Sequence, residues 1–257
     1  MKIINNDEKI NNVLKSFLPV IEQDYSILKG NLLKDDEKSF IYNNPNAFVI
    51  GLISDQSVKA ELAWSLPYSL YKRLGTFDFK YIVQNIDAQF LEKVIKEKPA
   101  LHRYPNRMAN YIFFAMKKIL EEYNNDAQKI WKNQQASVIV KRLEEFKGIS
   151  HKKASLGTLI LIRDLGVDIE DKQNIDIAYD VHIRRIFLRM GLVEKDTQEN
   201  IINKSKKINP KFPGELTTSF WAIGRKYCFA NNPNCDNCPL HHYCREYEMK
   251  TSMKVGA

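Results

Sequence analysis

Residues 143–160 read LEEFKGISHKKASLGTLI and contain a short turn between two apolar, helix-forming stretches. Apolar residues recur at helical spacing on both sides of the short segment 147–150, which predicts two helices joined by a tight turn. Gly148 can adopt a positive φ, as a sharp helix-to-helix turn often requires. The backbone N–H groups that begin the second helix then point outward and suit a phosphate, and the cations at 147 and 151–153 add positive charge. Alone, the pattern also fits an ordinary helical hairpin with a solvated face.

Helical periodicity extends through most of the chain, whereas few segments alternate with a period of two, so the predicted fold class is all-α. We interpret the apolar run AFVIGLI at 47–53 as a buried helix that continues to Trp64, rather than as a strand, with Pro67 interrupting it. Residues 30–45 are predicted to be polar and irregular, and residues from Thr251 to be a frayed tail. Other helices are predicted at 8–29, 87–97, 105–123, 126–132, 135–146, 151–165, 177–190, 196–208 and 214–224.

All four cysteines of the chain lie in one stretch, CFANNPNCDNCPLHHYC at 228–244. Their isolation indicates a single shared role, and the start MKIINNDEKINN lacks an apolar signal segment, which favours a reducing cytosol over disulfides. Four thiolates in a compact loop can hold a tetrahedral Zn²⁺ or an iron–sulfur cluster. The common zinc pattern has two close pairs and a long spacer. Because no long spacer is present here, the pattern favours a [4Fe–4S] cluster bound by Cys228, Cys235, Cys238 and Cys244.

The composition of the chain further limits the class of protein to which it can belong. The 257 residues are 44% hydrophobic, which is ordinary for a globular chain, and no apolar stretch approaches the roughly 20 residues of a membrane helix. The formal net charge of +8 favours a polyanionic partner such as nucleic acid, although a solvated lysine-rich surface has the same charge.

The segment IDIAYDVHIRRIFLRM at 175–190 places one carboxylate, Asp180, near the start of a predicted helix. An aspartate in that position is most often a helix cap. His182, Arg184 and Arg185 follow, so a cationic surface is expected beside the carboxylate.

These three motifs occur in an order that resembles endonuclease III, a family of DNA glycosylases of the helix–hairpin–helix superfamily. The cysteine spacing, GRKYC at 224–228, YDVHIRRIFLRMGL at 179–192 and ISDQSV at 53–58 are each similar to a family motif. The resemblance covers about residues 48–247. It implies a glycosylase region at 41–250 after a helical extension at 1–40, with a tail at 251–257. A helical barrel is expected at about 48–165, and a cluster subdomain is expected from about 177–250 together with the N-terminal helix.

The resemblance also implies roles for individual residues. Lys152 matches the catalytic lysine of members that also cleave abasic sites, with Lys153 as its rival, and Asp180 matches the family's catalytic aspartate. Gln56 matches the residue that enters the vacated base stack. Further DNA contacts are expected from Gly148, Ser150, His182 and Arg185, and the four cysteines are expected to bind a [4Fe–4S] cluster.

The implied function is excision of a damaged base from double-stranded DNA, with lyase activity at the abasic site, by a monomer in the cytoplasm that associates with the nucleoid. Alternatives are a glycosylase without the lyase step, an iron–sulfur DNA-binding protein without catalysis, and a zinc-ribbon regulator. The chain departs from the family at Lys147 and Ser150, where proline and glycine are usual. The segment 163–176 is longer than usual and is expected to shape the pocket. The stretch FANNPN lacks the usual basic residues, so phosphate contacts are expected from Arg225 and Lys226.

Overall fold

The longest apolar run of the chain forms a buried helix, α3 (Pro45–Ser54). The Asn44 side chain caps it by accepting hydrogen bonds from the backbone N–H groups of Asn46 and Ala47. Pro45 occupies the first turn, where its missing N–H costs nothing. Residues 47–53 are all buried, so α3 is enclosed by its neighbours. The interpretation of this run as a helix is confirmed, but the helix ends at Ser54 and a new one begins at Ala60.

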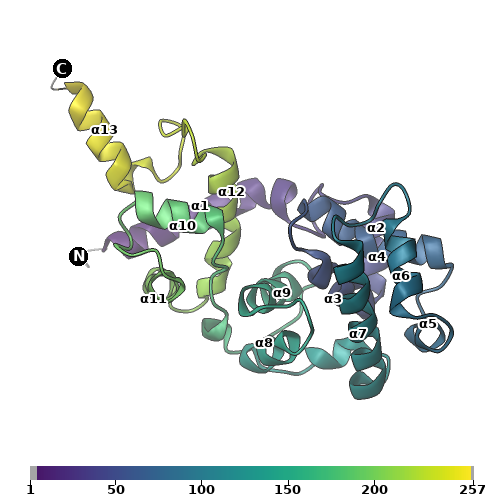
Figure 1. The fold of residues 1–257 in the computed structure, drawn as a ribbon. Coiled ribbons are helices and arrows are strands. Elements are labelled where there is room, and N and C mark those ends of the chain that lie inside the picture. The colour runs from purple at the N-terminus through teal and green to yellow at the C-terminus, as the bar shows by residue number, and fades with distance from the viewer. Residues whose placement is uncertain (1–4, 256–257) are drawn as a thin grey trace. The chain divides into compact units, whose positions relative to one another are not determined.

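The computed structural model describes residues 5–255, and over this range it is helical without any strand (Figure 1). The all-α prediction is therefore confirmed. The chain divides into two compact units, which we name the hairpin unit (residues 26–170) and the cysteine unit (residues 1–25 and 171–257). The hairpin unit contains α2 (Asp35–Asn43), α3, α4 (Ala60–Leu74), α5 (Phe79–Asn85), α6 (Ala88–Lys96), α7 (Pro105–Tyr123), η1 (Ala127–Ile130), α8 (Ala136–Glu144) and α9 (His151–Arg163). The cysteine unit contains α1 (Asn6–Tyr25), η2 (Lys172–Asn174), α10 (Val181–Arg189), α11 (Gln198–Ile208), η3 (Pro213–Glu215), α12 (Leu216–Lys226), η4 (His241–Tyr243) and α13 (Arg245–Val255).

The core of the hairpin unit is built around α3, which packs against α4 and α7, while α8 packs against α9. The Phe48 ring lies 5.6 Å from the Trp64 ring and 5.4 Å from the Trp131 ring, measured between centroids. At the end of α9 the buried Asp164 fixes the start of the unit. Its carboxylate accepts the Leu28 N–H at 3.1 Å, and its carbonyl accepts the Tyr42 hydroxyl at 2.8 Å.

The core of the cysteine unit joins the first helix of the chain to the last third of the sequence. Helix α1 packs against α11 and α12, and α10 packs against α12. Leu14 of α1 is buried with Ile183, Phe187 and Phe220, and the last two rings lie 5.0 Å apart. Helix α1 thus belongs to the core of the cysteine unit, whereas α2 packs against α3 and α4 in the hairpin unit.

Several predicted boundaries are wrong. Helix α1 ends at Tyr25, and the segment 30–45 contains α2. The acidic residues 35–37 favour a helix start, and the Glu37 carboxylate accepts the Lys34 N–H at 2.9 Å. Near the C-terminus, α13 continues to Val255, past the predicted start of a frayed tail at Thr251.

Pro67 was expected to interrupt a helix, but it lies inside α4, which continues to Leu74. A proline in a helix interior removes one backbone hydrogen bond. Here Pro67 is buried together with Trp64, Leu66 and Leu70, so packing offsets the lost bond. Short α5 carries too few residues to show a clear period, and it was not predicted. None of the helices between residues 5 and 255 has the length and apolar character needed to cross a membrane.

Candidate functional site

The turn between α8 and α9 has the geometry that its sequence predicts. Gly148 has a φ of +89°, in the left-handed region that glycine tolerates. The Ile149 N–H donates to the Phe146 carbonyl at 3.0 Å and closes the turn. Ser150, which stands where the family usually has a second glycine, has a φ of −85°, so this substitution introduces no backbone strain. Ser150, which directly precedes α9, is exposed, so the first backbone N–H groups of this helix come immediately after an exposed residue.

Gly148 is also tightly enclosed. A Cβ atom there would lie 2.4 Å from the Tyr111 ring, whereas a Cβ atom at Gly75, with a φ of +71°, would have no neighbour within 4 Å. We expect Gly75→Ala to lower the free energy of unfolding by about 1 kcal/mol through backbone strain alone. Gly148→Ala should lower it by roughly 2 kcal/mol more because the Tyr111 ring must shift. Urea unfolding of both variants measures this difference, and equal losses would contradict the close contact with Tyr111.

Gln56 lies beside the hairpin turn. Its side-chain amide donates to the Ile53 carbonyl at 2.7 Å, and a Cβ atom at Gly148 would lie 3.3 Å from the same amide nitrogen. The ring Nε2 of the buried His102 lies 3.2 Å from the Gln56 carbonyl. Burial lowers the pKa of His102, which favours its neutral form. The structure thus brings Gln56 and Gly148 together, as neighbours on one face of the hairpin unit.

The two lysines at the start of α9 have different surroundings. Lys152 is half-buried. The side chain of Lys153 is only 6% exposed, and its Nζ donates to the Ile53 carbonyl at 2.8 Å and to the Gly148 carbonyl at 2.9 Å. Burial lowers the pKa of Lys153 from 10.5 to about 8, an effect that Asp55 opposes and the charge of Lys152 reinforces. Asp55 accepts the Trp64 indole N–H at 3.2 Å, and burial raises the pKa of its carboxyl.

The lowered pKa of Lys153 gives the stability of the protein a specific pH dependence. Between about pH 8 and pH 10.5 the unfolded chain holds more protons at this position than the folded chain, so stability rises with pH. Relative to Lys153→Met, the free energy of unfolding of the wild type is expected to increase by roughly 2 to 3 kcal/mol between pH 7 and pH 10. Urea unfolding of both proteins at the two pH values measures the increase, and a difference that does not change with pH would contradict it.

In the cysteine unit, Asp180 caps α10. Its Oδ1 accepts the backbone N–H groups of His182 at 2.9 Å and Ile183 at 2.8 Å. Because both bonds fall on Oδ1, the second carboxylate oxygen is not used by the cap. The predicted helix at 177–190 accordingly begins at Val181, and residues 175–180 precede it outside the helix.

Of His182 and Arg185, both predicted to contact DNA, Arg185 also holds the start of the cysteine loop (residues 228–244), and His182 packs against α12. Arg185 Nε donates to the Cys228 carbonyl at 2.7 Å, and its Nη2 donates to the Gly224 carbonyl at 3.1 Å. A Cβ atom at Gly224 would lie 2.5 Å from the His182 Cβ, so α10 and α12 meet closely here. Burial lowers the pKa of His182. The negative charge of Asp180 opposes this shift, and the positive charge of Arg185 reinforces it. Arg225 and Lys226, at the end of α12, are exposed.

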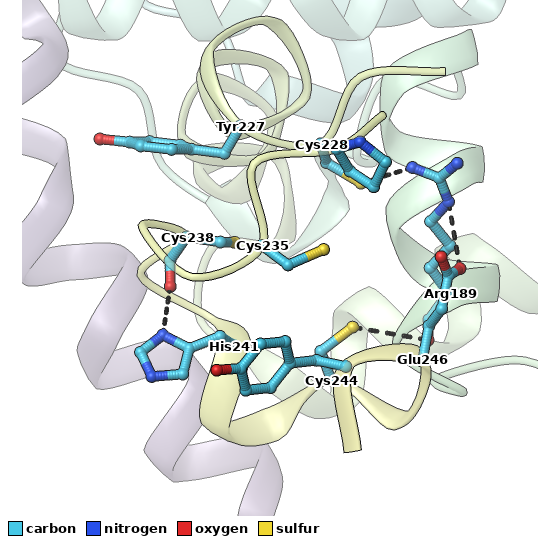
Figure 2. A pocket seen from close by; sticks show the side chains of 10 residues that line it. Arg189, Tyr227, Cys228, Cys235, Cys238, His241, Cys244 and Glu246 are labelled. Atoms are coloured by element: carbon cyan, nitrogen blue, oxygen red, sulfur yellow. Dashed lines mark hydrogen bonds and ion pairs between the residues drawn. The ribbon is translucent and has the colours of Figure 1, made fainter. Parts of the chain in front are cut away.

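The four cysteines line one pocket (Figure 2). Arg189 of α10 reaches the same pocket, where its Nη1 donates to Cys228 Sγ at 3.4 Å and to the Phe229 carbonyl at 2.6 Å. Glu246 of α13 pairs with Arg189 at 3.2 Å. The pocket is lined by Arg189, Tyr227, Cys228, Pro233, Cys235, Cys238, His241, Cys244, Glu246 and Tyr247.

The chemistry of this pocket suits a positively charged group bound by sulfur. Burial, reinforced by the neighbouring cysteines, raises the pKa of the Cys238 thiol to about 11. Burial also raises the pKa values of Cys235 and Cys244. Metal or cluster iron would offset the repulsion among thiolates, since ligation requires the deprotonated form. Within residues 5–255, no three His, Cys, Asp or Glu side chains are grouped so as to hold a single metal ion.

Comparisons with known proteins agree with the motifs. Endonuclease III of Thermotoga maritima is 33% identical over 80 residues, which are 31% of this chain and 38% of that protein. The chain therefore spans less than two thirds of the length of this relative. Endonuclease III of Bacillus subtilis is 22% identical over 225 residues, which are 84% of this chain and 88% of that protein. No protein-family model matches the chain.

The fold is also similar to solved structures. A trapped endonuclease III–DNA covalent intermediate has a TM-score of 0.66 and 19% sequence identity, covering 96% of this chain and 99% of that chain. At this identity the match describes the fold. The resemblance inferred from the motifs is confirmed: the chain is similar to endonuclease III in sequence and has its helical fold.

Proposed function

We propose that this endonuclease III-like chain is a DNA glycosylase that removes a damaged base from double-stranded DNA and then cleaves the abasic site as a lyase. The observation that carries the proposal is the hairpin turn, which presents Lys152 at the start of α9 and lies beside Gln56. The similarity to endonuclease III over most of the chain supports the same reading. We further propose that the protein acts as a monomer in the cytoplasm, on nucleoid DNA.

A base inside a duplex is out of reach, so the target nucleotide must first be rotated out of the stack. Gln56 suits the gap that remains, because its amide is neutral and can donate to and accept from the orphaned base. To enter the gap, Gln56 must release its 2.7 Å bond to the Ile53 carbonyl. The positive backbone end of α9 suits a DNA phosphate, and so do the exposed cations Arg225 and Lys226 of the cysteine unit.

Cleavage of the N-glycosidic bond develops positive charge on the sugar, which a carboxylate stabilises. Asp180 is our candidate, since its cap bonds use only Oδ1. The Lys152 amine attacks C1′ as the base leaves with the electrons of the N-glycosidic bond. The amine then gives a proton to the sugar ring oxygen O4′, the C1′–O4′ bond breaks, and a protonated imine forms between Lys152 Nζ and C1′. Loss of a proton from C2′ then expels the 3′ phosphate and breaks the strand.

For the cysteine pocket we propose a [4Fe–4S] cluster ligated by Cys228, Cys235, Cys238 and Cys244. All four thiols line one pocket, and Arg189 donates to Cys228 Sγ, as expected beside an anionic cluster. When bound, the cluster would fold the cysteine loop and hold it against α10. Arg185 and Arg189 then fix the start of that loop through the Cys228 and Phe229 carbonyls.

Removal of one ligand tests the cluster. We expect Cys235→Ser to abolish the visible absorption of anaerobically purified protein and to lower its iron content. Because metal binding and folding are coupled, protease cleavage within residues 229–243 should become faster. Iron, sulfide and zinc analysis of the wild type is the matched measurement. Stoichiometric zinc with no iron would show that the four cysteines bind zinc and not an iron–sulfur cluster.

The test of the function is borohydride trapping of the wild type on a duplex containing one abasic site, with an intact duplex as control. A covalent adduct with the abasic duplex alone, together with strand cleavage, is the expected result. Base release from a panel of lesions without an adduct would indicate a glycosylase without the lyase step. No activity on either substrate by cluster-replete protein would overturn the proposal.

A further inference from the structure

Lys153 joins two backbone segments, one of which lies 100 residues from it in the sequence. Its Nζ donates to the carbonyl of Ile53, next to the last residue of α3, and to the carbonyl of Gly148 in the hairpin turn. We name this three-part contact the Lys153 bridge. Two of the three ammonium donors are thereby used on the backbone, inside the hairpin unit.

Each end of the Lys153 bridge carries a residue of the proposed site. The Ile53 carbonyl that accepts Lys153 Nζ at 2.8 Å also accepts the Gln56 amide at 2.7 Å. The Gly148 carbonyl belongs to the turn that leads into α9 and Lys152. The bridge therefore ties the segment that carries Gln56 to the segment that presents Lys152.

Packing alone does not account for a lysine at this position. An apolar side chain of similar length would fill the same space without removing a charge from water. Asp55 is the carboxylate that faces Lys153, and it already accepts the Trp64 indole N–H at 3.2 Å. Lys152 and His102 face the same region and offer no negative charge. A lysine that is buried although an apolar side chain could fill its place indicates a role other than stabilising the fold.

We propose that Lys153 is a positioning residue, whose ammonium group holds the Gln56 segment against the hairpin turn so that both engage a flipped-out nucleotide together. The inference rests on the proposed function. It assigns Lys153 no contact with DNA and no covalent step. Without the bridge, the end of α3 and the turn at Gly148 would lose the two hydrogen bonds that join them through Lys153, and Gln56 would lose a fixed starting position.

A double-mutant cycle tests the proposal. The wild type, Gln56→Ala, Lys153→Met and the double variant are compared for their affinity toward a duplex with a stable abasic-site analogue and toward the intact duplex. We expect each single variant to lose about ten-fold of the preference for the abasic duplex, and the double variant to lose little more. The two losses should not add, because Lys153 has no Gln56 side chain to position once Gln56 is replaced by alanine. The control Lys141→Met removes an exposed charge from α8 and should weaken binding to both duplexes equally.

Three outcomes would count against the proposal. An unchanged preference in Lys153→Met, or losses that add in the double variant, would overturn the bridge while leaving the proposed function intact. A wild type that shows no preference for the abasic duplex would overturn the proposed function itself. Circular dichroism checks folding, and if Lys153→Met is unfolded, the cycle is run with Lys153→Gln and judged by the same criteria.

Discussion

Replacing Lys152 by alanine is expected to slow covalent trapping on an abasic duplex by roughly a thousand-fold or more, because the attacking amine is removed. Lys153→Met should still form the adduct, since Lys153 Nζ is bound to two carbonyls and its side chain is only 6% exposed. Adjacent side chains of a helix point about 100° apart, so only one of the two lysines can face the pocket. The measurement is the single-turnover rate of borohydride trapping for the wild type and both variants.

The pKa of Lys153 favours the opposite assignment, because burial lowers it to about 8 and so leaves more neutral amine at physiological pH. A lowered pKa is typical of lysines that form imines. If Lys153→Met loses the adduct and Lys152→Ala retains it, the nucleophile is Lys153 and the bridge is a resting arrangement. Lys141→Met serves as the matched control for the loss of one positive charge.

Much of the fold follows from local sequence signals. The turn at 147–150 is predicted because glycine readily adopts a positive φ such as that of Gly148, and the buried helix α3 follows from a continuous apolar run. Signals that depend on tertiary contacts were not visible. Pro67 remains inside a helix because its neighbours are buried, and the polar helix α2 is held by packing against α3 and α4.

The same distinction between local sequence signals and tertiary contacts applies to the candidate site. Which residues lie in the hairpin and the cysteine loop can be predicted from motifs and spacing. The difference between Lys152 and Lys153 cannot, because it arises from the Ile53 carbonyl, which is 100 residues away in the sequence. In the same way, the sequence predicts a DNA contact for Arg185 but does not predict that its guanidinium binds the Cys228 and Gly224 carbonyls.

Asp180→Asn is expected to lower the single-turnover rate of base excision by roughly 10²- to 10³-fold, because the charge that stabilises the developing cation is lost. The structure of the site should survive this change. Asparagine is as good a helix cap as aspartate, and its Oδ1 can still accept the N–H groups of His182 and Ile183. The thermal midpoint should therefore stay close to that of the wild type, which separates a loss of chemistry from a loss of folding.

Asp87→Asn supplies the matched control for this change. Asp87 caps α6 by accepting the Phe90 N–H at 2.8 Å, so the same substitution is made at another helix start, outside the candidate site. If both variants excise bases at the wild-type rate, Asp180 is a cap and nothing more, and the catalytic carboxylate must be sought elsewhere. If only Asp180→Asn is slow while both remain folded, the carboxylate charge itself is required, because the cap is preserved in each.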